Sequence, residues 1–163
     1  MKTLKDRKGF TLIEILIVIG IIAILAAIVV IAINPARQFA QARNSQRTSN
    51  VNAILNAIGQ NIADNKGVFA CTSHPYFTAA GVAVSKNGAD IRPCLVTTYM
   101  PEIVVDPSGG SNTCVDTNPG DCASGSYDTK YTVATSSTGR YTVCAPGGTE
   151  AAIPGSTAIC ITR

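Results

Sequence analysis

The sequence predicts an α+β protein in which a long N-terminal helix, kinked or broken near Pro35, packs by its C-terminal half on a small antiparallel sheet stapled by disulfides. Three observations lead to this prediction. Residues 10–33 are almost entirely apolar, residues 36–66 have helical periodicity, and the remainder is rich in turn residues and holds all six cysteines. The predicted segments are 1–9, a hydrophobic helix at 10–33, an amphipathic helix at 34–66 and a globular head at 67–163.

The net charge of +3 lies entirely in the first nine residues, which hold Lys2, Lys5, Arg7 and Lys8 against Asp6. The rest of the chain carries nine basic and nine acidic side chains. Its five tyrosines and scattered basic residues form no basic aromatic stripe. A nucleic-acid partner therefore has no support in the sequence.

The apolar run at residues 10–33 has 24 residues and one charge, Glu14. At about 1.5 Å per residue it would cross a bilayer core of roughly 30 Å. It is too long for the apolar core of a secretory signal and has no small-residue cleavage site at its end. A plain membrane anchor fits the length but leaves Glu14 unexplained, because a carboxylate inside such a helix costs at least about 2.5–3.5 kcal/mol.

The run from Lys8 to Glu14, KGFTLIE, follows a short basic stretch and opens the apolar run. This pattern resembles the class III signal of type IV prepilins, of the pilin-like superfamily. The resemblance implies that a membrane prepilin peptidase cuts between Gly9 and Phe10 and methylates the new N-terminus on Phe10. Residues 1–9 would then be a leader peptide, and the hydrophobic helix would stay in the mature protein.

The resemblance also implies the fold and the assembly: a lollipop-shaped pilin subunit that polymerises into a helical homo-oligomeric filament. The precursor would lie in the cytoplasmic (inner) membrane, and the filament would be an extracellular pilus on the cell surface, built by an assembly platform and its ATPase. Adhesion, motility or DNA uptake would be its outputs, with no enzymatic activity and no cofactor. The alternatives are a pseudopilin of a type II secretion system, a minor pilin and, from another class, a monomeric membrane-anchored binding protein.

Glu14 acquires a role through this resemblance. In the family filament the glutamate neutralises the amino terminus of a neighbouring subunit, here Phe10. Opposite charges attract strongly in a low-dielectric helix bundle, and a wrong axial register leaves both unpaired. The alternative is that Glu14 pairs with the amine of its own chain, four residues away on the same helical face.

Asn34 and Pro35 predict the helix break, since asparagine suits an N-cap and proline suits the first turn. They fit a plain boundary between two helices and a flexible joint equally well. Beyond them, an apolar stripe with spacings of three and four needs a sheet or helix to cover it: Val51, Ile54, Leu55, Ile58 and Ile62. Residues 43–50 are polar on every side, and we expect them to be solvated.

Short β-like runs follow at residues 94–100, 102–105, 129–135, 140–145 and 158–162. The clearest hairpin joins the third and fourth runs through residues 136–139. If the last two runs pair antiparallel with Cys144 facing Cys160, then Thr142 faces Thr162, and the apolar residues of both strands point towards the helix.

Six cysteines allow 15 disulfide connectivities. The strand register favours Cys144–Cys160, and a compact loop favours Cys114–Cys122. Cys71–Cys94 is left by elimination. Disulfides indicate that the head matures in an oxidising compartment.

No catalytic or metal site is predicted. His74 lies three residues from Cys71 in a turn-rich segment, but a disulfide would occupy that thiol. The acidic loop at residues 116–121 lacks the ligand alternation of a calcium loop, and we interpret it as a solvated turn. Asp106 and Pro107 are interpreted as a turn as well. The chain contains no P-loop, zinc-protease helix or dinucleotide fingerprint.

Overall fold

The computed structural model describes residues 9–32, 34–71, 77–118 and 120–163. The chain forms two compact units, Met1–Ala36 and Arg37–Arg163. Apart from Gly9, the predicted leader peptide lies outside the described residues. His74 lies outside them too.

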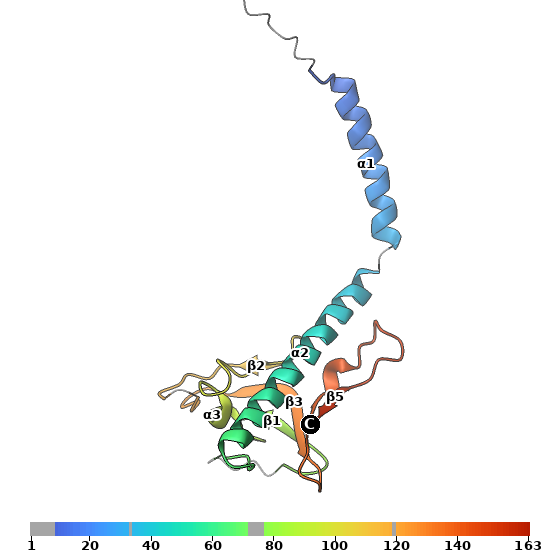
Figure 1. Cartoon of the computed structure of the whole chain (residues 1–163). Helices are drawn as coiled ribbons and strands as arrows, with labels where there is room; N and C mark the ends of the chain where they lie inside the picture. The colour runs from blue at the N-terminus through green and yellow to red at the C-terminus, as the bar shows by residue number, and fades with distance from the viewer. Residues whose placement is uncertain (1–8, 33, 72–76, 119) are drawn as a thin grey trace, which may run out of the picture. The chain divides into compact units, whose positions relative to one another are not determined.

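Two helices occupy the N-terminal part of the chain (Figure 1). Helix α1 spans Leu12–Ala32 and helix α2 spans Pro35–Asp64. Proline begins a helix readily because its missing N–H is not needed in the first turn, whereas inside a helix it breaks the backbone ladder. Two helices thus stand where the sequence predicts a kink or break near Pro35.

Helix α2 contributes one side of the core. Val51, Ile54, Leu55 and Ile58 are at most 3% exposed and pack against the sheet, and Ile62 lies at the margin. Full burial of such a side chain contributes about 1.5–3 kcal/mol. The apolar stripe that the sequence predicts is therefore the surface that joins helix and sheet.

The sheet has five antiparallel strands, and α2 crosses one of its faces (Figure 1). The strands are β1 (Val82–Ser85), β2 (Ser111–Asn112), β3 (Tyr127–Thr135), β4 (Tyr141–Ala145) and β5 (Ile159–Thr162). Their order is β1-β3-β4-β5, and β2 pairs with the beginning of β3. The α+β fold class predicted from the sequence is confirmed.

The β4–β5 register places Thr142 opposite Thr162 and Cys144 opposite Cys160, as the sequence predicts. The two threonine hydroxyls are 2.7 Å apart and hydrogen-bonded. Val143 lies between Thr142 and Cys144 along β4, and its side chain points to the other face and is completely buried in the core. Alternation along β4 therefore separates an inner apolar face from an outer face of small side chains.

Two of the predicted strands are wrong. Residues 92–95 form a short helix, α3 (Arg92–Leu95), with Pro93 in its first turn, and residues 96–100 form a tight turn joined by one isolated bridge. Residues 102–105 form no strand either. The apolar side chains that suggested strands instead enter the core from irregular backbone, as Leu95 and Ile103 do. Strands β1 and β2 were not predicted, because four and two residues carry too little periodic signal.

The prediction that residues 43–50 are solvated is also wrong, because Arg47 is only 1% exposed. Its Nε donates to Asp106 Oδ2 at 2.6 Å, and its Nη2 donates to Ser108 Oγ at 2.7 Å. Its Nη1 donates to Glu150 Oε1 at 2.5 Å. Arg43, one turn earlier, binds both oxygens of the same glutamate at 2.7 Å. Helix α2 is thus tied through charge to two separate loops. Asp106 opens the turn that the sequence predicts there and is in addition a buried ion.

The ion pairs lower the pKa values of the two carboxylates in this network. Burial alone would raise the pKa of Asp106, but hydrogen bonds from Arg47 and Ser108 outweigh it and lower that pKa to about 2. Hydrogen bonds from Arg43 and Arg47 lower the pKa of Glu150 to about 2 as well. Both carboxylates therefore remain charged at any pH above about 3.

We predict that Arg47→Met destabilises the head by about 3–5 kcal/mol near neutral pH, because it leaves buried Asp106 without a counter-charge. The measurement is denaturant unfolding of the full chain in detergent micelles, followed by the tyrosine signal. Exposed Arg140→Met is the control and should change stability by less than about 0.5 kcal/mol.

We also predict that the stability difference between wild type and Arg47→Met depends on pH. A carboxylate with a lowered folded-state pKa contributes stability above its unfolded pKa of about 4, and loses that contribution as pH falls through about 2. The difference between wild type and Arg47→Met should therefore be full at pH 6 and shrink below pH 4. A difference that is the same at pH 6 and pH 2 would show that Arg47 acts through packing alone.

Candidate functional site

The candidate site is the segment from Gly9 to Glu14, where the predicted cleavage, methylation and assembly residues lie together. Gly9 and Phe10 precede helix α1 and belong to no helix or strand. Phe10 is 86% exposed, and nothing lies within 4 Å of where a Cβ on Gly9 would stand. The peptide bond between them is therefore open to an enzyme.

Thr11 and Glu14 form a reciprocal cap on the first turn of α1. The Thr11 backbone N–H and the Thr11 hydroxyl both donate to Glu14 Oε2 at 2.8 Å. In return, the Glu14 N–H donates to the Thr11 hydroxyl at 3.3 Å. This is a capping box, in which an N-cap threonine and the glutamate three residues later satisfy donors that the helix leaves open.

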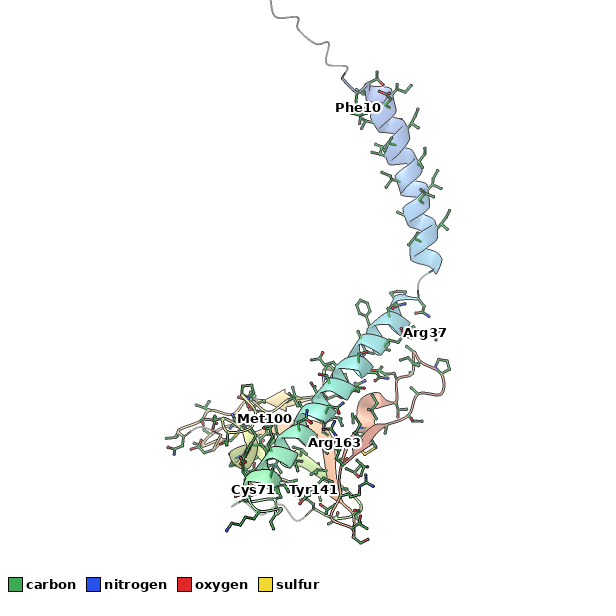
Figure 2. All side chains as sticks on the ribbon, in the orientation of Figure 1. Phe10, Arg37, Cys71, Met100, Tyr141 and Arg163 are labelled. Carbon is green, nitrogen blue, oxygen red and sulfur yellow. A yellow bond between two sulfur atoms is a disulfide. The ribbon has the colours of Figure 1, made fainter. Side chains whose placement is uncertain are left out.

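The rest of α1 is apolar on every side. All side chains of Leu12–Val29 are exposed, and this stretch is long and apolar enough to cross a membrane (Figure 2). Glu14 is the one charged residue of α1. An exposed helix without a polar face has to be covered by something outside its own unit, either lipid or other protein.

Sequence reasoning assigned no separate role to Thr11, although the T-x-x-E spacing that announces a capping box is present. It predicted that the Glu14 carboxylate pairs with the N-terminal amine of a neighbouring chain or of its own chain. The structure gives Glu14 an additional local partner, Thr11. Both bonds that Glu14 accepts from Thr11 end on Oε2, and Oε1 takes part in neither.

The head contains three disulfides, Cys71–Cys94, Cys114–Cys122 and Cys144–Cys160. The predicted strand register favoured Cys144–Cys160, the compact loop favoured Cys114–Cys122, and Cys71–Cys94 was left by elimination. Each closes a local part of the head rather than joining distant elements, because the partners are 8 to 23 positions apart in sequence. No described cysteine is a free thiol.

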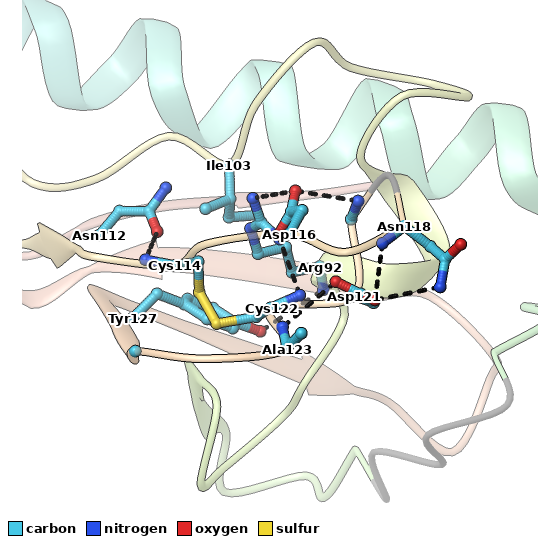
Figure 3. Close-up of polar contacts among 12 residues, drawn as sticks. Arg92, Ile103, Asn112, Cys114, Asp116, Asn118, Asp121, Cys122, Ala123 and Tyr127 are labelled. Atoms are coloured by element: carbon cyan, nitrogen blue, oxygen red, sulfur yellow. Dashed lines mark hydrogen bonds and ion pairs between the residues drawn. A yellow bond between two sulfur atoms is a disulfide. The ribbon is translucent and has the colours of Figure 1, made fainter.

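The acidic loop at residues 116–121 is held by protein groups (Figure 3). Asp116 binds the buried guanidinium of Arg92 at 2.6 and 2.9 Å and accepts the backbone N–H of Cys122. Hydrogen bonds from Arg92 first, and then from the loop backbone, lower the pKa of Asp116 to about 2. Asp121 accepts backbone N–H groups within the loop. These carboxylates therefore hold the loop in shape, and within the described ranges no cluster of three metal-ligating side chains occurs.

Comparison with known families bears directly on the N-terminal segment. Residues 4–30 match the family model described as the prokaryotic N-terminal methylation motif. This match supports a type IV pilin-like protein. No curated protein and no solved structure matches the chain. The likeness to that family is thus carried by the segment that contains Gly9, Phe10, the capping box and most of α1.

We predict that Thr11→Val loosens the first turn of α1 by about 1 kcal/mol, because it removes the hydroxyl that donates to Glu14 and accepts from its N–H. Amide hydrogen exchange of the full chain in micelles should be about fivefold faster at Glu14 and Ile15, whose N–H groups donate to the Thr11 hydroxyl and carbonyl. Thr48→Val is the matched control, because its hydroxyl bonds the Asn44 carbonyl within α2 and caps nothing. Unchanged exchange in Thr11→Val would contradict a capping role.

Proposed function

We propose that this pilin-like chain is the precursor of a type IV pilin. A prepilin peptidase cleaves it between Gly9 and Phe10, Phe10 is methylated, and the mature subunit enters an extracellular helical filament. The observation that carries the proposal is helix α1, which exposes apolar side chains on all sides, has one carboxylate in its first turn and lies mostly within the matched motif. The filament serves adhesion, motility or DNA uptake.

Glu14 is the proposed register residue of the filament. After cleavage, the new Phe10 ammonium of one subunit pairs with the Glu14 carboxylate of the next. The capping box supports this role, because it fixes the carboxylate at the helix start through Oε2 and leaves Oε1 for a second donor. Pairing with the amine of the same chain is the competing arrangement. Either pairing removes an uncompensated charge from an apolar bundle.

The subunit waits in the cytoplasmic membrane, where lipid covers α1. An assembly platform and its ATPase then extract it, and contacts between helices replace lipid. Repeated head-to-tail contacts of one chain build an open filament rather than a closed ring. The three disulfides support this route, since disulfides form and persist in oxidising compartments.

A pseudopilin of a type II secretion system, or a minor pilin, would carry the same N-terminal motif. The discriminating observation is whether cells bear long surface fibres labelled by an antibody against residues 67–163. A monomeric membrane-anchored binding protein is the remaining alternative, and it would keep Met1 at its N-terminus.

We predict that the mature protein begins at Phe10 with a methylated amine. Intact-mass measurement of protein purified from cells that contain the peptidase should show the loss of residues 1–9 and the gain of one methyl group. Gly9→Val should block the cut, because a branched side chain replaces the residue that fits the peptidase. Gly20→Val, at an open position within α1, is the control and should be processed normally. A mature protein that still begins at Met1 would refute the proposal.

We predict that Glu14→Gln and Glu14→Val separate the two roles of the glutamate. Glutamine keeps an acceptor for Thr11 but loses the charge, whereas valine loses both. If charge pairing sets the register, both variants should be cleaved but form at least about tenfold fewer filaments, counted by electron microscopy of sheared fibres. Normal fibres from Glu14→Gln together with few fibres from Glu14→Val would show that the cap matters and the charge does not.

A further inference from the structure

Strand β3 contains an irregularity where it pairs with β1. Ala83 of β1 faces Thr132 of β3, but Ser85, only two residues along, faces Asp128. Strand β3 therefore carries two extra residues in a bulge. The bulge is held in place, because the Thr129 hydroxyl donates to the Val84 carbonyl at 2.8 Å. Bulges are found preferentially beside functional sites, where they redirect side chains.

Lys130 lies at this bulge with φ +62°, a left-handed conformation that glycine or asparagine adopts more easily. Its ammonium lies 2.5 Å from the carboxylate of Asp128, and the two side chains are 54% and 40% exposed. A strained backbone residue persists only where its surroundings impose it, and such residues cluster at binding and active sites.

A cleft of about 430 Å³ opens beside the bulge, within the range of small-molecule sites. Its lining includes Ala83, Ser108, Asp128, Lys130, Thr132 and Pro146. One wall is fixed by the buried ion network, because the Ser108 hydroxyl binds Arg47 and Asp106. A Cβ on Gly147, also in the lining, would come within 3.0 Å of Asp106 Oδ2. The cleft therefore lies in a rigid part of the head.

The charges and polar groups of the lining indicate which class of ligand the cleft can bind. Asp128 and Lys130 compensate each other's charge, so they favour neither an anion nor a cation. Together they offer a strong acceptor and a strong donor side by side, which neighbouring hydroxyl groups of one molecule can use at once. Ala83 and Pro146 add an apolar surface against which C–H groups can pack. We propose that this cleft binds a neutral sugar through Asp128 and Lys130.

The test uses the full chain in micelles of a detergent without a sugar headgroup. Saturation-transfer NMR is recorded with the methyl glycosides of glucose, galactose, mannose and N-acetylglucosamine. We expect transfer to at least one glycoside. Lys130→Asn, which suits the left-handed backbone but removes the ammonium, should weaken that binding by about tenfold or more. Ala83→Tyr should block the cleft from an exposed strand position that accepts aromatic residues.

Arg140→Asn is the control, because it removes an exposed cation on the turn between β3 and β4, outside the lining of the cleft. Intact disulfides, checked by non-reducing mass, establish that each variant is folded. The proposal fails if no glycoside receives saturation, or if Lys130→Asn and Ala83→Tyr bind as the wild type does. It fails equally if acetate or phosphate competes with the glycoside, because the site would then be an anion site. Neither cleavage nor filament assembly enters this test, so its outcome is independent of the proposed function.

Discussion

The head depends on one buried cation. Arg47 is 1% exposed, and an ion removed from water costs several kcal/mol unless its hydrogen bonds are satisfied. Asp106, Ser108 and Glu150 satisfy it from two loops that are otherwise remote from each other in sequence. Because the guanidinium must keep these partners, both loops are fixed on α2. The same constraint shapes the cleft on the outer side of the sheet, since Ser108 belongs to both.

The parts of the molecule that the sequence predicted correctly are those with local, repeated signals. The α2 stripe recurs every three or four residues, so its burial follows from helical geometry. Alternation along the two strands allows only a few β4–β5 registers, and the pairing of Cys144 with Cys160 selects one of them. The N-terminal motif has a fixed spacing. The capping box of Thr11 also had a local signal, and it was missed because Glu14 was considered only as a partner for amines.

The errors come from interactions between residues far apart in the chain. Arg47 sits in a polar stretch, and its partners lie 59 and 103 residues away, so nothing local distinguishes it from a solvated arginine. Arg92 is also buried, and its carboxylate partners Glu102 and Asp116 lie 10 and 24 residues away. The apolar residues near Leu95 resemble a strand, but Pro93 favours a helical first turn. The bulge at Lys130 has no sequence signal, because lysine is an unusual residue for its conformation.

The chain has two apolar helical surfaces, and it buries only one of them itself. The stripe of α2 is buried by the sheet of its own unit, whereas the side chains of Leu12–Val29 are exposed on every side. Lipid and a bundle of like helices are equally apolar, so moving α1 from one to the other changes little hydrophobic free energy. The preference for one arrangement must then come from close packing and from polar groups. Glu14 is the one charged group on this surface, and it is held in the first turn. In the filament that we propose, this carboxylate is the group that would distinguish one axial register from the next.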